Sequence, residues 1–432
     1  MKKNHFFANV NIWLVGVSLL LSSCEKAPEM NITSDEVIIE ANQNEAATFN
    51  ISSNVFWTIK TIQDEIWITV HPTEGKGDAT ITVKATENVE FTQRTAFIVI
   101  LGEGVKTDTI KIIQAPSLDI AEKIEDVIFK QFCLKEFDNS PKDGRISAKE
   151  ALSAIEINVK GMEIKSLKGI EYFTRLRKLK FPVNHIEEID VSKNKEIREL
   201  DCSFNPISKI DVSELSKLSD LYLHNTKIQS VDVTKNLELY QLTTSNSPIS
   251  SINVTENKKL AVLLCNDNLL TDLDVTKNPE LLMLFCGNNR LNSLNLSMNQ
   301  NLVNLWCNNQ TDGNNKKLLK QIDISHNKAL QTFSCGQNDI SDLDLSNNAE
   351  LTQLRCEENQ LTGLDISKNP KIGDLKCNNN KLKEVIDISN NKSLKYIDLR
   401  KNPYLTTIQV WKGFKESNYY EKDSMARYVE KQ

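Results

Sequence analysis

The sequence is poor in glycine and proline, with 14 and 10 residues among 432. This scarcity excludes a collagen-like or low-complexity chain. Beyond the N-terminus there is no apolar run long enough for a transmembrane helix. The sequence also lacks the H-E-x-x-H zinc motif, the G-x-S-x-G nucleophile elbow and the phosphate-binding loop. We therefore expect a non-catalytic protein with no catalytic residues and no required cofactor.

Positive charge is in the minority, with 52 Lys and Arg against 58 Asp and Glu and a net charge of −6. An acidic protein repels phosphate backbones and anionic lipid, so nucleic acid is not an expected partner. The chain is otherwise ordinary, with 40% hydrophobic and 25% charged residues. Its length allows two or three domains with their own cores.

The N-terminus has the order of an export signal. Lys2 and Lys3 precede an apolar run from Ile12 to Leu21, and Ser22, Ser23 and Cys24 follow. Residues 1–23 thus resemble a bacterial lipoprotein signal peptide. The resemblance implies lipid attachment at Cys24, a tether over 24–30 and an outer-membrane protein anchored at the cell surface. Ordinary secretion with a leftover cysteine is the alternative, and the surface and periplasmic faces both remain open.

Cysteine spacing reveals an internal repeat. Cys265, Cys286 and Cys307 are 21 residues apart, as are Cys335, Cys356 and Cys377. Eleven units follow this period between Phe181 and Leu399, with seven extra residues after Cys307. An Asn recurs three residues after the Cys position and an Asp opens the second half of most units. This period predicts a leucine-rich-repeat solenoid in which short parallel strands stack and the Asn side chains bond backbone groups.

The tandem L-x-C-x-x-N-x-L-x-x-L-D-V-S-x-N pattern over 160–411 resembles the internalin-like, cysteine-ladder leucine-rich repeats of bacterial surface proteins. That resemblance implies adhesion or receptor-like binding through the concave face. The repeated cysteines occupy an inward-facing position, so we expect a column of small buried side chains. Disulfides between adjacent coils fit poorly, because parallel Cβ atoms would lie about 4.8 Å apart. Zinc is not expected, since no C-x-x-C pair occurs.

Residues 31–116 alternate apolar and polar side chains over short runs separated by turn residues, which predicts a small antiparallel β-sandwich. The string from Trp67 to Gly77, Arg94-Thr95 and the ending Ile110 to Gln114 resemble the BACON domain. The family implies carbohydrate or mucin binding. Trp57 and Trp67 could stack on sugar, although strand tryptophans usually belong to the core. We favour a spacer role for this domain.

Residues 117–159 are expected to form a helical connector that caps the solenoid, with Ile120, Ile124, Ile128 and Phe132 on one helix face. The segment that follows the first helix resembles a degenerate EF-hand or dockerin loop. Its candidate calcium ligands are Asp138, Asn139, Asp143 and Glu150. The favoured alternative is a tight turn followed by a Ser147–Glu150 capping box. We expect residues 407–411 to cap the other end, and 412–432 to be a mobile tail.

Alternation along each strand places the residues one and three positions before the Cys position on the concave face. Large apolar residues gather there in consecutive units, which predicts an exposed binding patch at the centre of the groove. The extra loop near residues 311–316 could instead cover this patch. The candidate ligand-binding residues are Tyr222, Val262, Leu264, Met283, Phe285, Trp306, Asn308 and Arg355.

The expected fold is therefore mostly β: a small β-sandwich, a helical cap and a right-handed leucine-rich-repeat solenoid. The expected function is that of an adhesin or receptor-like lipoprotein that recognises an extracellular protein or peptide. A glycan-binding lipoprotein of a polysaccharide-uptake or mucin-adhesion system is the alternative. A homodimer interface on the concave patch also remains open.

Overall fold

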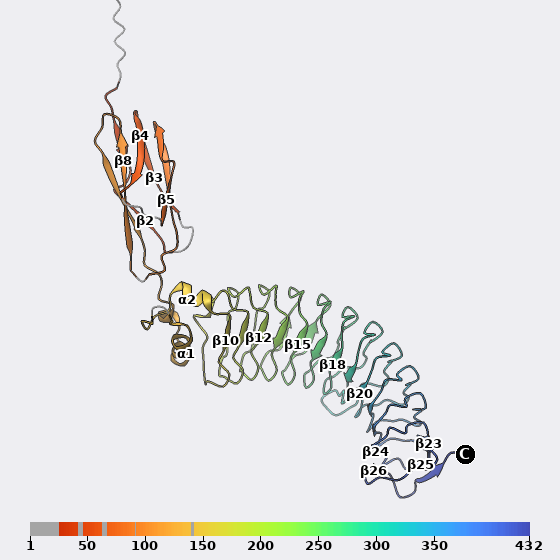
Figure 1. Ribbon diagram of the computed structural model, residues 1–432. Helices are drawn as coiled ribbons and strands as arrows, with labels where there is room; N and C mark the ends of the chain where they lie inside the picture. The colour runs from red at the N-terminus through yellow and green to blue at the C-terminus, as the bar shows by residue number, and fades with distance from the viewer. Residues whose placement is uncertain (1–25, 42–45, 63–66, 91, 140–141) are drawn as a thin grey trace, which may run out of the picture. The chain divides into compact units, whose positions relative to one another are not determined.

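The computed structural model describes residues 26–41, 46–62, 67–90, 92–139 and 142–432. The predicted signal peptide and Cys24 lie outside these residues. The chain divides into two compact units, 1–117 and 118–432, which are described separately (Figure 1). Over the described part of the chain, no helix combines the length and apolar character that a membrane span requires.

The N-terminal unit is a β-sandwich of two sheets. One sheet has the order β1-β3-β7-β5 and the other β2-β9-β8-β4-β6. All pairs are antiparallel except β2 and β9, which run parallel, so the predicted antiparallel sandwich is correct apart from this edge pair. The strands are β1 (Met30–Ile32), β2 (Glu36–Ile39), β3 (Ala46–Ser53), β4 (Phe56–Thr61), β5 (Ile68–His71), β6 (Glu74–Lys76), β7 (Ala79–Ala85), β8 (Arg94–Gly102) and β9 (Asp108–Gln114).

Both tryptophans of the sandwich belong to its core. Trp57 is 1% exposed and donates its indole N–H to the Gly77 carbonyl at 2.8 Å, and Trp67 is 8% exposed beneath the Arg94 guanidinium. A buried indole has no free face for a sugar, so the interpretation of these residues as core is confirmed.

The solenoid unit begins with three short helices: η1 (Ile120–Lys123), α1 (Val127–Phe137) and α2 (Ala148–Ser153). The predicted helix face is wrong beyond Ile124. Asp126 caps the start of α1 by accepting the Ile128 and Phe129 amides, which ends one helical segment and begins another. The buried face of α1 is therefore Phe129, Cys133 and Phe137, while Ile128 is exposed.

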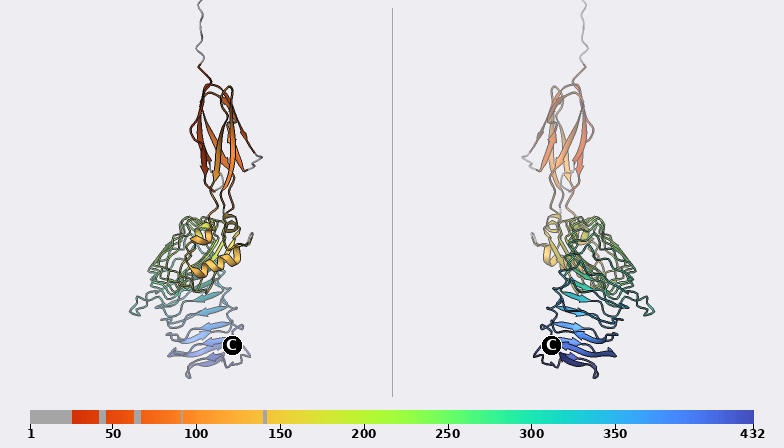
Figure 2. Two further views of the ribbon diagram at one scale, coloured as in Figure 1. Left: turned by 90° about the vertical axis from the view of Figure 1, so that its left-hand side faces the viewer. Right: turned by 90° about the vertical axis from the view of Figure 1, so that its right-hand side faces the viewer.

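Thirteen parallel strands form the main sheet, which follows the inner side of the solenoid's curve (Figure 1). In Figure 2 the coils toward the C-terminus are seen as a stack of parallel arrows. They extend beyond the predicted limits of 160 and 411 because the first and last strands lack the repeat consensus. In order they are β10 (Glu156–Asn158), β11 (Lys178–Lys180), β12 (Glu199–Asp201), β13 (Asp220–Tyr222), β15 (Gln241–Thr243), β17 (Val262–Leu264), β18 (Met283–Phe285), β19 (Asn304–Trp306), β20 (Thr332–Ser334), β21 (Gln353–Arg355), β22 (Asp374–Lys376), β24 (Tyr396–Asp398) and β26 (Tyr420–Glu421).

The outer side of the solenoid is extended. It carries the 3₁₀ turn η2 (Ile170–Tyr172) and two small parallel sheets. The first pairs β14 (Ser230–Asp232) with β16 (Ser251–Asn253), and the second has the order β23 (Lys383–Asp387), β25 (Tyr404–Val410), β27 (Arg427–Glu430).

Two ladders of asparagine hold the coils together. In the predicted ladder, Asn289 donates to the Cys265 and Cys286 carbonyls at 2.9 and 3.0 Å and accepts the Leu270 amide. Sequence reasoning missed the second ladder. There Asn278 donates to the Val254 and Asn257 carbonyls at 2.9 and 2.8 Å, and equivalent residues repeat this from coil to coil. Each side chain thus links its own coil to the preceding one, which offsets the polar cost of turning the backbone inside a solenoid.

The cysteine column is confirmed as buried and unbridged. All eight cysteines among the described residues are free and buried. Burial raises the pKa of Cys286 to about 12, so the thiol stays protonated and behaves as a small apolar side chain.

The C-terminal residues differ from the prediction. Residues 412–432 form no tail: β26 extends the main sheet beside β24, and β27 extends the outer sheet beside β25. Trp411, Phe414, Tyr420 and Tyr428 gather in ring-to-ring contacts at this end. The last coil has no further repeat to cover its apolar interior, so this aromatic cluster closes it.

Candidate functional site on the concave face

The strands of the main sheet expose two columns of side chains and bury the residue between them. In β17, Leu263 is buried while Val262 and Leu264 are half-exposed, and the same pattern holds in β18 and β19. Leu264, Phe285 and Trp306 are direct partners on adjacent strands, as are Val262 and Met283. The predicted binding residues therefore lie on one face.

We call Leu264, Phe285 and Trp306 the apolar ridge. The Phe285 and Trp306 rings stack with centroids 4.2 Å apart and planes 9° from parallel. Neighbouring side chains of the ridge shield one another, so Leu264 and Phe285 are only half-exposed. Trp306 remains 43% exposed. The extra loop after Cys307 therefore does not cover the indole. Its backbone instead forms a bridge between Thr311 and Lys317.

Other predicted residues lie apart from the ridge. Tyr222 is separated from Leu264 by the strand that carries Thr243, and Arg355 is separated from Trp306 by the strand that carries Ser334. Ser334 breaks the run of large side chains and opens the Trp306 hollow, a space of about 380 Å³. This hollow is lined by Asn266, Asp267, Gly287, Asn288, Trp306, Asn308, Ser334, Gln337, Arg355 and Glu357.

Two glycines shape the floor of the hollow. A Cβ at Gly287 would lie 2.6 Å from the Asn308 Oδ1, and one at Gly336 would lie 2.8 Å from the Glu357 Cδ. The absence of side chains here lets Asn308 and Glu357 lean against the backbone of the preceding coil. Sequence reasoning found Trp306, Asn308 and Arg355 but missed Glu357 and the floor. The sequence feature that could have predicted this floor is a glycine directly after the Cys position in two units, Gly287 and Gly336, where other units carry a larger residue.

The charges at the two ends of the face are partly neutralised within it. Lys180 pairs with Glu199 at 2.8 Å, and Arg355 pairs with Asp374 at 3.1 Å. Partly exposed ion pairs of this kind contribute little stability. The ridge and the hollow, rather than opposite charge, are the distinctive features of the face.

One serine–histidine pair lies on this face. The Ser203 Oγ is 2.9 Å from the His224 Nδ1, and the edge of His224 meets the Phe204 ring at 5.0 Å between centroids. Ser203 is fully buried, so its hydroxyl is not open to a substrate. Burial lowers the pKa of His224, although Asp201 opposes the shift. The pair orients the imidazole, and we do not assign it a nucleophilic role.

Two of the candidate calcium ligands, Asp138 and Glu150, accept hydrogen bonds from backbone amides of the loop and the following helix. Asp138 accepts the Asp143 and Gly144 amides at 3.0 and 2.8 Å, and Glu150 accepts the Asn139 and Ser147 amides, both at 2.9 Å. The predicted Ser147–Glu150 capping box is confirmed. Residues 140 and 141 of this loop lie outside the described residues. Within the described ranges, no group of three or more metal-binding His, Cys, Asp or Glu side chains gathers.

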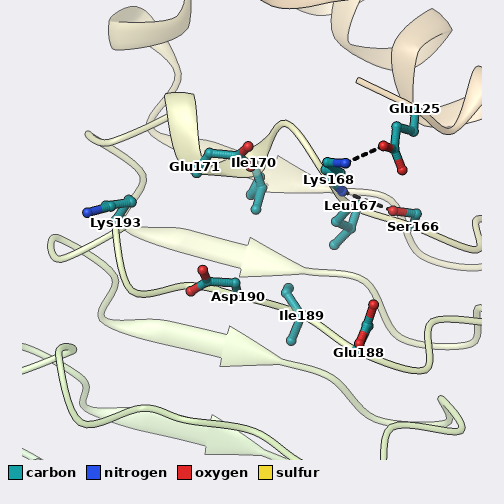
Figure 3. A pocket seen from close by; sticks show the side chains of 10 residues that line it. All are labelled: Glu125, Ser166, Leu167, Lys168, Ile170, Glu171, Glu188, Ile189, Asp190 and Lys193. Carbon is teal, nitrogen blue, oxygen red and sulfur yellow. Dashed lines mark hydrogen bonds and ion pairs between the residues drawn. The ribbon is translucent and has the colours of Figure 1, made fainter. Parts of the chain in front are cut away.

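A larger hollow of about 570 Å³ lies where the first coils meet the connector (Figure 3). Glu125 faces Lys168 as an ion pair, and Glu188, Asp190 and Lys193 lie along the next coil. Asp190 accepts the Ser192 amide, so this carboxylate serves the turn that opens the second half of the unit. The hollow has no aromatic surface, which makes it a weaker candidate than the concave face.

The comparisons with known proteins agree with this architecture. The family model described as "BACON: Putative binding domain, N-terminal" matches residues 56–115, within the sandwich. A search of curated proteins found no match.

Solved structures resemble the solenoid. An internalin, InlF, from Listeria monocytogenes has a TM-score of 0.60 and 20% identity, covering 72% of this chain and 97% of that one. The functional domain of InlJ from Listeria monocytogenes, which includes a cysteine ladder, has a TM-score of 0.44 and 25% identity, covering 68% and 77%. The likeness to InlF confirms the predicted internalin-like leucine-rich-repeat fold.

Proposed function

We propose that this chain is a non-catalytic surface lipoprotein, anchored to the outer membrane through Cys24. It binds an extracellular protein or peptide with the concave face of its solenoid. The observation that carries the proposal is the apolar ridge, whose stacked rings end in an indole that is 43% exposed. Exposed aromatic clusters at the centre of a regular face typically supply most of the binding energy of a protein interface.

The geometry of the face supports a rigid binding surface. Its strands pair in register, so the ridge needs no ordering when a partner arrives. Val262 and Met283 widen the ridge by a second half-exposed column. A partner with an apolar helix or loop could cover both columns at once. The sandwich then acts as a spacer, since its tryptophans are buried.

The test is binding of a soluble chain of residues 25–432, which lacks the proposed lipid anchor, to an array of extracellular proteins and glycans. A triple alanine variant of Leu264, Phe285 and Trp306 should lose the hit, because it removes the whole ridge. The matched control is the double variant Leu237→Ala and Met298→Ala, which removes apolar side chains 56% and 53% exposed outside the main sheet. A hit that survives the ridge variant refutes the proposal, and a hit that both variants lose assigns it to nonspecific hydrophobic contact.

A glycan ligand is the second candidate. The Trp306 hollow favours it, because it joins one exposed aromatic ring to several hydrogen-bonding side chains.

A further inference from the structure

We infer that the Trp306 hollow is a subsite for one neutral pyranose ring, so the ligand of the concave face carries sugar. The inference rests on the proposed binding role of that face. It begins with a gap in the column of side chains. Phe285, Trp306, Ser334 and Arg355 are successive partners on adjacent strands.

The gap has the width of a ring. Adjacent strands are about 4.8 Å apart, so Trp306 and Arg355 stand about 10 Å from each other across the small side chain of Ser334. The indole uses one face to stack on Phe285, which leaves the opposite face toward the gap. A saturated ring placed there would contact the indole at stacking distance and still reach the guanidinium.

The remaining walls are polar. Asn308 and Glu357 form the floor, and Gln337 lies at the rim. The Glu357 side chain is 16% exposed, and its Oε1 lies 3.6 Å from the Lys376 Nζ. Ligand hydroxyls would pair with the amides and carboxylates that line the hollow, whereas an apolar side chain of a protein ligand would cover these groups unpaired at a cost in affinity. This contrast favours a hydroxyl-rich ring over a phenyl or indole ring.

The charge of the hollow favours a neutral sugar. Glu357 pairs with Lys376 at 3.6 Å and Arg355 pairs with Asp374 at 3.1 Å, while Asp267 has no ion-pair partner among the described residues. A uronic or sialic acid would bring its carboxylate toward Asp267, while both cations near the hollow already have a carboxylate partner. The combination of one apolar face, several planar hydrogen-bonding groups and no excess cation suits a neutral hexose or N-acetylhexosamine.

The test is saturation-transfer NMR on residues 25–432 with glucose, galactose, mannose and N-acetylglucosamine, and with glucuronate as the anionic comparison. At least one neutral sugar should bind with about millimolar affinity, as expected for a ligand of about twelve non-hydrogen atoms. Glucuronate should bind at least about tenfold more weakly. No transfer from any of the four neutral sugars overturns the inference, and so does a preference for glucuronate.

Two phenylalanine variants locate the site. Ser334→Phe fills the gap with a side chain of its own, so sugar binding should be lost. Thr332→Phe adds the same ring two residues earlier on β20, outside the hollow, and should bind sugar as the unmodified chain does. Equal binding by both variants places the sugar elsewhere and overturns the inference. Circular dichroism checks that both are folded.

A third variant tests the chemistry of the floor. Glu357→Gln keeps the shape of the side chain but weakens its acceptor, and should lower sugar affinity about tenfold. An unchanged affinity contradicts the assignment of Glu357. The proposed function can stand without the sugar: loss of a protein ligand in the ridge variant, with no sugar bound by any chain, supports the proposed function alone. Sugar binding that Ser334→Phe abolishes and Thr332→Phe preserves, with no protein ligand found, supports the subsite alone.

Discussion

The second asparagine ladder should be a main source of the solenoid's stability, and Asn278→Ala tests this. The side chain is fully buried and donates to the Val254 and Asn257 carbonyls at 2.9 and 2.8 Å. Each carbonyl also accepts one backbone amide, so the substitution removes a second hydrogen bond from both. At about 1 kcal/mol for each bond, the free energy of unfolding should fall by about 2 kcal/mol.

The assay is urea unfolding followed by tryptophan fluorescence. The matched control is Asn301→Ala, because Asn301 donates to the Pro279 carbonyl of the preceding coil at 3.2 Å but is exposed. Water replaces that bond, so the control should change the free energy of unfolding by less than about 0.5 kcal/mol. If Asn278→Ala costs no more than the control, the ladder does not stabilise the coils and the reasoning is wrong. Asn278→Asp should cost more, since it turns a carboxylate toward two carbonyls.

Further predictions concern the connector, the cysteines and the titrating side chains. Glu150→Ala should lower the free energy of unfolding by about 1 kcal/mol through loss of the capping box; calcium should not shift the melting temperature of the unmodified chain, and a calcium-dependent rise would contradict the hydrogen-bonded assignment of this loop. Because burial raises the pKa of Cys286 to about 12, a thiol reagent at pH 8 should leave the folded protein unlabelled and react only at the rate of unfolding; rapid labelling of this position would refute it. The Ser192 amide holds the pKa of Asp190 below its ordinary value. The ionised carboxylate therefore stabilises the folded chain above about pH 4, and this stabilisation is lost as the pH falls further. Asp190→Asn should flatten the dependence of the free energy of unfolding on pH in that range, as measured by urea unfolding. Burial lowers the pKa of His224, so the unfolded chain takes up a proton first and stability should fall as the pH drops below about 6.5; His224→Gln should remove this part of the loss, and an unchanged pH profile would exclude it.

The sequence alone was sufficient for the architecture because a solenoid is nearly one-dimensional. A side chain's place within the 21-residue unit is also its place around the coil, so the Cys column, the predicted Asn ladder and the ridge could be read from spacing. The sandwich followed from alternation, and its tryptophans from the burial that strand aromatics favour. The resemblance to internalin-like repeats and the predicted apolar patch favoured a binding protein.

Only the tertiary structure determined the features that depend on contacts between segments rather than on the 21-residue period. The face of α1 shifted because Asp126 restarted the helix, which periodicity across both segments concealed. The last residues form a cap because an open solenoid end leaves apolar side chains to be covered. The Trp306 hollow exists because Ser334 is small and because Asn308 and Glu357 lean over Gly287 and Gly336. The shape of this hollow depends on the directions of side chains in several coils at once. The spacing of residues within one unit does not predict those directions.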